Sequence, residues 1–269
     1  MCRYFNAMLS KIHNALNQIN TTKYNSFYIA GNIYNFGFSI KDTQIFSQIF
    51  LSKFQKKIGR NKDLFVPTAT LNLIENGEKF SSKNTKSYMM GIFSEFVRKK
   101  KLSYRSNHPL WSFAGLGKNV KKVLKDTSYS AYGKDSVFDR LLKRNTLFIS
   151  MGKPHKSLGM LHYAEHIVGV PYRFNKEFKI KVQNKNKVKK QYCLLGVRFN
   201  SNKLAKDDNK KIVMKLKKKK VFKIIKLNKG ELYCADYNLL VNELINILNN
   251  NPKIWLKNEK IIQKKYIED

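Results

Sequence analysis

A histidine and a carboxylate stand three residues apart in this sequence, as His162 and Glu165 of the run Leu-His-Tyr-Ala-Glu. If the segment is helical, both side chains leave from one face. An imidazole titrates near neutrality and can accept a proton from an attacking nucleophile, while a neighbouring carboxylate can orient the ring and stabilise the imidazolium. The spacing therefore indicates a catalytic pair, with His162 as general base and Glu165 as its orienting partner.

Other assignments of these residues stay open on sequence alone. A lone histidine in a helix is more often structural than catalytic, and Glu165 could pair with a surface lysine. Asp236, at a junction between a strand and a helix, is a second candidate for orienting the base. His155 lies in the preceding loop and could face a ligand, whereas His166 is expected to point elsewhere.

Two polar segments upstream of this pair could contact an anionic ligand. Residues 105–112 read Arg-Ser-Asn-His-Pro-Leu-Trp-Ser, and residues 132–136 read Tyr-Gly-Lys-Asp-Ser. Guanidinium and hydroxyl groups suit phosphate oxygens. The alternatives are a surface salt bridge for Arg105, a turn at His108 and an N-cap for Ser136.

Hydrophobic periodicity places these residues on alternating strands and helices. Strands are expected at 26–30, 64–66 and 146–151, and helices at 10–19, 43–58, 90–100, 119–126, 136–143 and 158–168. His162 thus lies on a helix that follows a strand and a loop containing Gly152 and Pro154. Loops at strand ends commonly carry the chemistry of α/β proteins.

The pattern changes after Pro171, where antiparallel strands are expected at 178–182, 191–199 and 221–227, turns at 185–190 and 228–230, and a last helix at 237–248. The basic block Lys215–Lys220 is expected on a solvated strand edge or hairpin. We predict a single α/β domain over 1–269, three-layer α/β/α-like, with a central mixed sheet and an antiparallel C-terminal portion. It divides into an N-terminal helix (1–25), a cofactor and catalytic core (26–178) and antiparallel strands with a C-terminal helix (179–269).

Three cysteines, Cys2, Cys193 and Cys234, lie far apart and form no metal-ligand spacing or disulfide framework. We expect a reducing compartment and no metal. No apolar run approaches the ~20 residues that span a bilayer, and residues 1–20 lack the apolar region of a signal peptide. A cytoplasmic protein without membrane insertion is expected.

The order and spacing of these motifs resemble the aminoglycoside 3-N-acetyltransferase family. Residues 162–165 and 170–173 resemble its active-site helix and the segment that follows it, in the form His-Tyr-Ala-Glu and Val-Pro-Tyr-Arg. Residues 105–112 resemble its Arg-Ser-x-His-Pro-x-x-Ser run, 132–136 its aromatic-Gly-x-x-Ser element, and 65–70 its strand ending in Pro-Thr-x-Thr. The likeness extends from about residue 26 to residue 252.

The resemblance implies transfer of an acetyl or other short acyl group from coenzyme A to an amine, with acetyl-CoA as the expected cofactor. The matching histidine of the family is the general base, which corresponds to His162 here, with Glu165 beside it. By the same resemblance we expect cofactor contacts from Asn32, Arg105, Ser106, Ser112 and Ser136.

One segment and one single position depart from the family pattern. Ala30-Gly31-Asn32 stands where the family usually has a His-Ser-Ser or His-Ser-Asp turn that meets the cofactor, and Gly159 stands in place of a threonine. Backbone amides beside Gly31 could still serve a phosphate, because glycine permits close approach. The departures allow a different acceptor, or a member that binds a ligand or partner without turnover.

The formal net charge of +35, from 53 basic and 18 acidic residues, bears on which class of acceptor is expected. Such a field attracts polyanions such as coenzyme A or a nucleotide-sugar and repels polycationic aminoglycosides. The Pro-Tyr-Arg-Phe-x-Lys segment from Pro171 also resembles family members linked to surface polysaccharide. We therefore expect a small-molecule acceptor, a nucleotide-activated amino sugar, and a monomer or homodimer.

Two other functions remain as alternatives. One is an aminoglycoside-acetylating resistance enzyme. The other is a basic, non-catalytic nucleic-acid-binding protein. Against the second, the basic residues are spread along the chain, whereas nucleic-acid modules more often carry a stripe of arginines and aromatics. No nucleic-acid partner is therefore expected.

Overall fold

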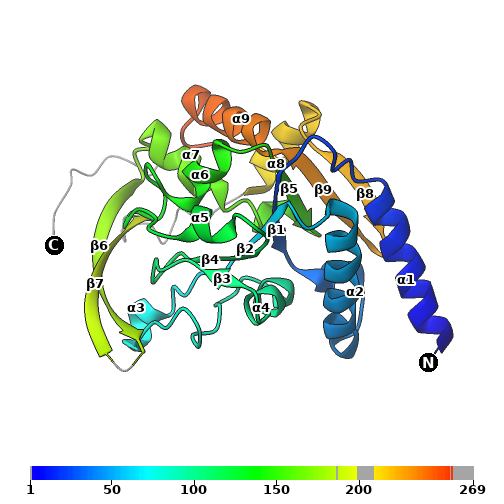
Figure 1. Cartoon of the computed structure of the whole chain (residues 1–269). Coiled ribbons are helices and arrows are strands. Elements are labelled where there is room, and N and C mark those ends of the chain that lie inside the picture. Colours follow the sequence, from blue (N-terminus) through cyan, green and yellow to red (C-terminus); the bar gives the residue numbers. More distant parts are fainter. Residues whose placement is uncertain (1, 186, 199–208, 255, 257–269) are drawn as a thin grey trace.

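The computed structural model of the chain describes residues 2–185, 187–198, 209–254 and 256. A mixed sheet of seven strands forms its centre, in the order β3-β4-β2-β1-β5-β9-β8 (Figure 1). The strands are β1 (Ser26–Gly31), β2 (Asp63–Pro67), β3 (Tyr104–Arg105), β4 (Phe113–Leu116), β5 (Thr146–Met151), β8 (Lys223–Leu227) and β9 (Gly230–Asp236). β1 pairs in parallel with β2 and β5, and the remaining pairs are antiparallel. The predicted single α/β domain with a mixed sheet is confirmed.

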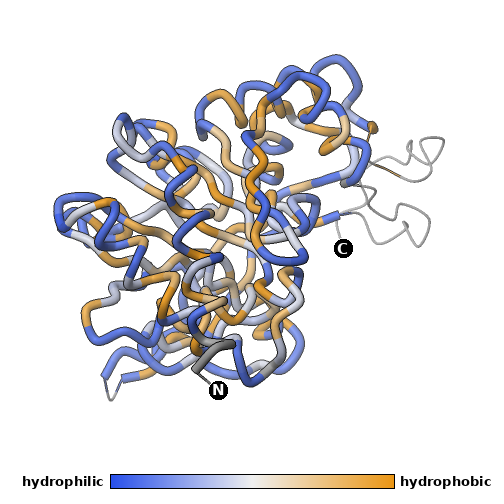
Figure 2. Tube along the Cα trace, turned by 90° about the vertical axis from the view of Figure 1, so that its right-hand side faces the viewer, coloured by the Kyte–Doolittle hydropathy of each residue, from blue (hydrophilic) through white to orange (hydrophobic). Residues whose placement is uncertain are grey.

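Side chains alternate across the sheet and create two apolar layers. On β1, Phe27 and Ile29 belong to one buried cluster, and Tyr28 and Ala30 belong to the other. The first layer holds α1 (Cys2–Asn17), α2 (Ile40–Ile58) and α4 (Ile92–Arg98). The second holds α5 (Val120–Leu124), α6 (Val137–Leu142), α7 (Met160–Val168), α8 (Asn209–Lys218) and α9 (Tyr237–Asn250). In Figure 2, hydrophobic segments run through the interior and hydrophilic ones lie mainly at the periphery.

A long antiparallel hairpin of β6 (Arg173–Asn184) and β7 (Lys187–Arg198) stands beside the main sheet (Figure 1). Its inward side chains Ile180, Cys193 and Leu195 join the second apolar layer. The predicted strands 178–182 and 191–199 are therefore parts of one longer hairpin, although Phe199 itself lies outside the described residues. The predicted turn at 185–190 is shorter, because β7 already begins at Lys187.

The basic block Lys215–Lys220 was wrongly predicted to form a strand edge or hairpin. It continues α8, which ends at Lys218. Ile212, Val213 and Leu216 of that helix are buried at helical spacing. The surrounding lysines obscure this short apolar stripe in the sequence, so the helix is recognised only through its packing.

The remaining differences concern short or terminal elements and β9, of which only the junction with the last helix at Asp236 was predicted. α1 begins at Cys2 rather than at residue 10, because Met8, Ile12 and Leu16 bury one continuous stripe. The short strands β3 and β4 were not predicted. Short helical turns α3 (Leu73–Asn76), η1 (Ile33–Phe36) and η2 (Pro154–Lys156) complete the described elements.

No helix in the described ranges is both long and apolar enough to cross a membrane. Over the same residues, no group of three or more His, Cys, Asp or Glu side chains is arranged to hold a metal ion. Of the three cysteines, Cys193 and Cys234 are buried free thiols.

Candidate active site

Helix α7 carries the predicted histidine and carboxylate pair on one face. The helix follows β5 through a loop and ends at Gly169, whose positive φ of 68° suits a glycine C-cap. His162 Nδ1 lies 2.7 Å from Glu165 Oε2. The side chain of Glu165 is fully buried, and that of His162 keeps 23% of its surface exposed. The expected helical geometry therefore brings the two groups into direct contact.

Glu165 is held by two further residues from the segment that follows the helix. The Tyr172 hydroxyl donates to Oε1 at 2.8 Å, and Arg173 Nε lies 2.8 Å from Oε2. Burial alone would raise the pKa of Glu165, but the hydrogen bond from His162 and the charge of Arg173 hold this pKa below its ordinary value. Glu165 is thus an ionised carboxylate in a fixed orientation.

The protonation state of His162 follows from the same contacts. Burial and the charge of Arg173 lower the pKa of His162, while the contact with Glu165 opposes this shift. A carboxylate can only accept a hydrogen bond, so Nδ1 carries the proton in the neutral ring. Nε2 is then the nitrogen that can accept a proton, which is the state required of a general base.

Two aromatic rings pack against the imidazole. The Trp111 ring lies edge-on at a centroid distance of 5.9 Å, and the Tyr132 ring lies at 5.4 Å. Both aromatic side chains are buried. Trp111 belongs to segment 105–112 and Tyr132 to segment 132–136, the two segments expected to meet the cofactor. Neither aromatic residue was predicted to be a site residue, yet these two pack against His162.

His108 holds Trp111 in this position. Its Nδ1 accepts hydrogen bonds from the backbone N–H groups of Leu110 and Trp111, so Nε2 carries the proton and donates to the Tyr129 carbonyl at 3.1 Å. Burial lowers the pKa of His108 to about 4. It is a neutral structural histidine that fixes the loop beside His162.

Arg105 and Ser112 belong to a buried polar network. The Arg105 guanidinium donates from Nε to Ser112 Oγ at 3.0 Å and from Nη2 to the Thr68 carbonyl at 2.6 Å, and it stacks 4.9 Å from the Phe80 ring centre. Ser112 Oγ also donates to the Thr68 carbonyl. Because Arg105 is 6% exposed and these donors are engaged, the geometry favours a scaffolding role over contact with a phosphate.

The other residues predicted to bind the cofactor lie in different parts of the fold. Ser106 Oγ accepts from the Phe113 N–H inside the fold, and Ser136 is the N-cap of α6. Asn32 is exposed at the end of β1, where its side chain caps η1. Asp236 caps α9 and lies near Lys23. Glu165 rather than Asp236 is therefore the carboxylate in contact with His162.

The glycines at the two departures from the family pattern, Gly31 and Gly159, stand where a side chain has little room. A Cβ at Gly31, whose φ is +113°, would stand 2.3 Å from the Met151 carbonyl oxygen, so serine does not fit this backbone. A Cβ at Gly159 would stand 3.1 Å from the buried Tyr28 hydroxyl. The small residue at 159 is thus matched to the bulky tyrosine beneath it.

Comparisons with known proteins agree with this architecture. The family model described as aminoglycoside 3-N-acetyltransferase matches residues 41–249. The match spans well over half of the chain, which therefore belongs to the aminoglycoside 3-N-acetyltransferase family, a family of N-acetyltransferases. The expected family and enzyme class are confirmed. A search of curated proteins finds no match.

Several solved structures share the fold. The apoenzyme of aminoglycoside acetyltransferase AAC(3)-IVa has 16% identity and a TM-score of 0.72, over 94% of this chain and 92% of that one. The YokD protein from Bacillus subtilis has 15% identity and a TM-score of 0.74, over 91% and 100%. AAC-IIIb in a binary complex with CoASH has 15% identity and a TM-score of 0.76, over 90% and 96%.

Proposed function

We propose that this chain transfers an acetyl group from acetyl-CoA to the amine of an amino sugar, with His162 as the general base. The observation that carries the proposal is the 2.7 Å contact between His162 and the buried Glu165 on α7, in a chain of this family. The binary complex of AAC-IIIb with CoASH supports acetyl-CoA as the cosubstrate.

The residues around His162 suit proton acceptance from an amine. Acetyl-CoA, when bound, supplies the acetyl group as a thioester. His162 Nε2 takes the proton that the amine loses as its nitrogen attacks, and Glu165 stabilises the resulting imidazolium through Nδ1. Arg173 and Tyr172 keep Glu165 ionised and oriented. The lowered pKa of His162 keeps the base neutral at neutral pH.

The five residues predicted to meet the cofactor differ in how well they suit that role. Asn32 is exposed at the carboxyl edge of the sheet, whereas Arg105, Ser106, Ser112 and Ser136 are buried. We propose that Asn32 and the end of β1 adjoin the cofactor, and that the buried members support the site from behind.

The acceptor has two candidates, each with its own support. An aminoglycoside is supported by the family itself and by relatives solved with such ligands: an AAC(3)-IVa variant in complex with a gentamicin and AAC-VIa bound to sisomicin. A nucleotide-activated amino sugar is supported by charge, whereas its use in a surface polysaccharide rests only on the resemblance of the segment from Pro171. The chain carries a formal net charge of +35, and Arg198 stands opposite Arg173, the partner of Glu165, in the hairpin register. Such a surface favours an anionic acceptor over a polycation.

The test is thiol release from acetyl-CoA with panels of nucleotide-linked amino sugars and of aminoglycosides. His162→Ala should lower kcat/KM by roughly 10²–10⁴-fold, because it removes the general base. His13→Ala is the matched control, since His13 is exposed on α1, and it should leave turnover unchanged.

The outcomes of this assay distinguish the two acceptor classes and test the role of His162. Turnover of sugar nucleotides alone supports the anionic acceptor, and turnover of aminoglycosides alone supports the other candidate. Undiminished activity in His162→Ala would remove His162 from its role. Absence of turnover with every acceptor would contradict the enzymatic proposal.

A further inference from the structure

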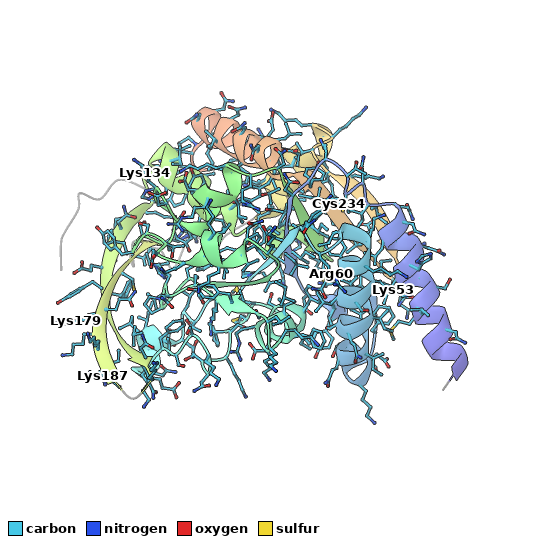
Figure 3. All side chains as sticks on the ribbon, viewed as in Figure 1. Lys53, Arg60, Lys134, Lys179, Lys187 and Cys234 are labelled. Carbon is cyan, nitrogen blue, oxygen red and sulfur yellow. The ribbon has the colours of Figure 1, made fainter. Side chains whose placement is uncertain are left out.

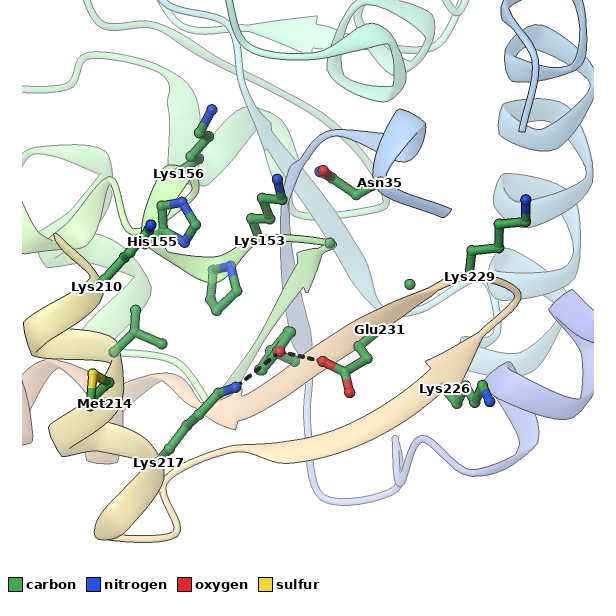
Figure 4. Close-up of a pocket in the computed structure, with 15 residues that line it drawn as sticks. Asn35, Lys153, His155, Lys156, Lys210, Met214, Lys217, Lys226, Lys229 and Glu231 are labelled. Atoms are coloured by element: carbon green, nitrogen blue, oxygen red, sulfur yellow. Dashed lines mark hydrogen bonds between the residues drawn. The ribbon is translucent and has the colours of Figure 1, made fainter. Parts of the chain in front are cut away.

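A cavity of about 890 Å³ opens between the end of β5, the turn joining β8 and β9, and helix α8. Figure 4 shows the side chains that line it. Six of them are lysines that come from three separate parts of the chain: Lys153, Lys156, Lys210, Lys217, Lys226 and Lys229. The volume lies within the range typical of small-molecule sites, roughly 300–1,000 Å³.

The cavity lies at a topologically favoured position. β1 has two parallel neighbours in the sheet. One is β2, the next strand in the chain, and the other is β5, which lies on the opposite side of β1. The strand order therefore reverses between β1 and β5, and ligands of open α/β sheets bind outside the carboxyl ends of strands at such a point. Asn35 after β1 and Gly152 after β5 both line the cavity.

The charge of the lining is strongly positive. Among the described residues that form it, the six lysines face a single carboxylate, that of Glu231. Lys217 Nζ lies 3.2 Å from the Tyr233 hydroxyl, which donates to Glu231, so these three side chains form a fixed group on one wall (Figure 4). The other five lysines are exposed side chains around the opening. Clustered ammonium groups raise the local concentration of anions.

We propose that this cavity binds the phosphates of a nucleotide-containing ligand. Several positive charges spread over a cavity of this size suit a multiply charged group such as a pyrophosphate better than a single carboxylate. Arg105, the cation expected from sequence to meet phosphate, is already engaged in the core, whereas these lysines reach the surface. Residues 152–156, which form one wall, precede α7, the helix that carries His162, by three residues in the chain.

Two sources could supply such phosphates: coenzyme A, or the nucleotide of an activated sugar. The choice between them rests on the proposed function, whereas the phosphate chemistry rests on the cavity alone. The experiment therefore measures binding by calorimetry on the full-length chain, with pyrophosphate, coenzyme A and uridine-diphosphate glucosamine as separate probes.

The test variant is Lys153→Glu with Lys210→Glu, which reverses exposed charges on two walls of the cavity. The control is Lys121→Glu with Lys215→Glu, two exposed lysines outside the lining and one of them on the same helix α8. The test variant should raise the Kd of at least one probe by about tenfold or more, because it replaces attraction by repulsion. The milder pair Lys153→Gln with Lys210→Gln should raise it less, and the control should change it little.

Loss of coenzyme A binding assigns the cavity to the cofactor, and loss of sugar-nucleotide binding assigns it to the acceptor. No binding of any probe by the wild type, an unchanged Kd in the test variant, or an equal change in the control would overturn the proposal. Thiol release separates this from the proposed function. Cavity-dependent binding without turnover would refute the catalytic proposal alone, while turnover that depends on His162 with unaltered binding would refute this one alone.

Discussion

Two arginines, Arg173 and Arg198, place positive charge near His162, the proposed base. Arg173 contacts Glu165, and Arg198 lies opposite Arg173 in the hairpin register. The positive charges of both arginines lower the pKa of His162 in addition to the effect of burial, and Glu165 acts in the opposite sense. Burial and the arginine charges thus favour a neutral imidazole, while the hydrogen bond from His162 and the charge of Arg173 keep Glu165 ionised.

The pH profile of kcat/KM should report the protonation of His162. The neutral form of His162 is the active one, so activity should fall on the acid side, with a midpoint below the ordinary histidine value of about 6.5. Arg198→Gln removes a positive charge, raises the pKa of His162 and should move this midpoint to higher pH. Glu165→Gln should move it lower and also reduce turnover. Arg60→Gln, at an exposed site just after α2 (Figure 3), should leave it in place; a shift of the Arg198 variant toward lower pH would contradict the assignment.

At the scale of the elements, one ion pair ties the parallel strands together at their amino ends. Asp63 at the start of β2 is fully buried, and Arg144 Nη2 lies 2.5 Å from its Oδ2. Arg144 Nε also donates to Ser26 Oγ of β1, and the Asn119 N–H donates to Asp63 Oδ1 before α5. The proposed active site lies toward the opposite, carboxyl edge of these strands, so this pair stabilises the sheet at the end remote from it.

Breaking this pair should weaken the whole fold. Asp63→Ala leaves the Arg144 charge without its buried partner and should lower the free energy of unfolding by about 3 kcal/mol or more. The control is Lys125→Ala, which removes an ion pair with Asp126 whose side chains are 58% and 77% exposed; it should change stability by about 0.5 kcal/mol or less. Urea denaturation compares the two, and equal stabilities would show that the Asp63 pair contributes nothing.

At the scale of the whole molecule, the positive charge is distributed over many elements. Figure 3 shows Lys53 on α2, Lys134 near α6, and Lys179 and Lys187 together on the hairpin, so these lysines lie on three separate parts of the fold. A nucleic-acid-binding surface would more often gather such residues into one stripe. The spread favours a general attraction for anions, with specificity supplied by local sites.

This attraction should make activity sensitive to salt. The kcat/KM for acetyl-CoA should fall by roughly tenfold between low and physiological ionic strength, because screening shortens the reach of the field. S-acetylpantetheine, which has the thioester but no phosphates, is the matched control and should show little dependence. Equal salt dependence for both substrates would contradict an electrostatic contribution from the phosphates.

Local patterns in the sequence predicted much of this molecule correctly. The periodicity around residues 158–168 predicted the helix, and the helix alone brings His162 and Glu165 together. Apolar runs predicted β1, β2 and β5, and the motifs between residues 105 and 173 indicated the family. These features follow from the sequence because helical spacing and strand alternation depend on near neighbours.

Only the tertiary structure decided which distant residues meet. Trp111 and Tyr132 reach His162, whereas Arg105 and Ser112 turn into the core, although both kinds of residue stand in the same motifs. The cavity brings together lysines from three separate parts of the chain, between Lys153 and Lys229. Helix α8 is recognisable as a helix mainly through the burial of Ile212 and Leu216. The physical reason is that strand order and the packing of layers set these contacts, and neither is encoded in the local spacing of residues.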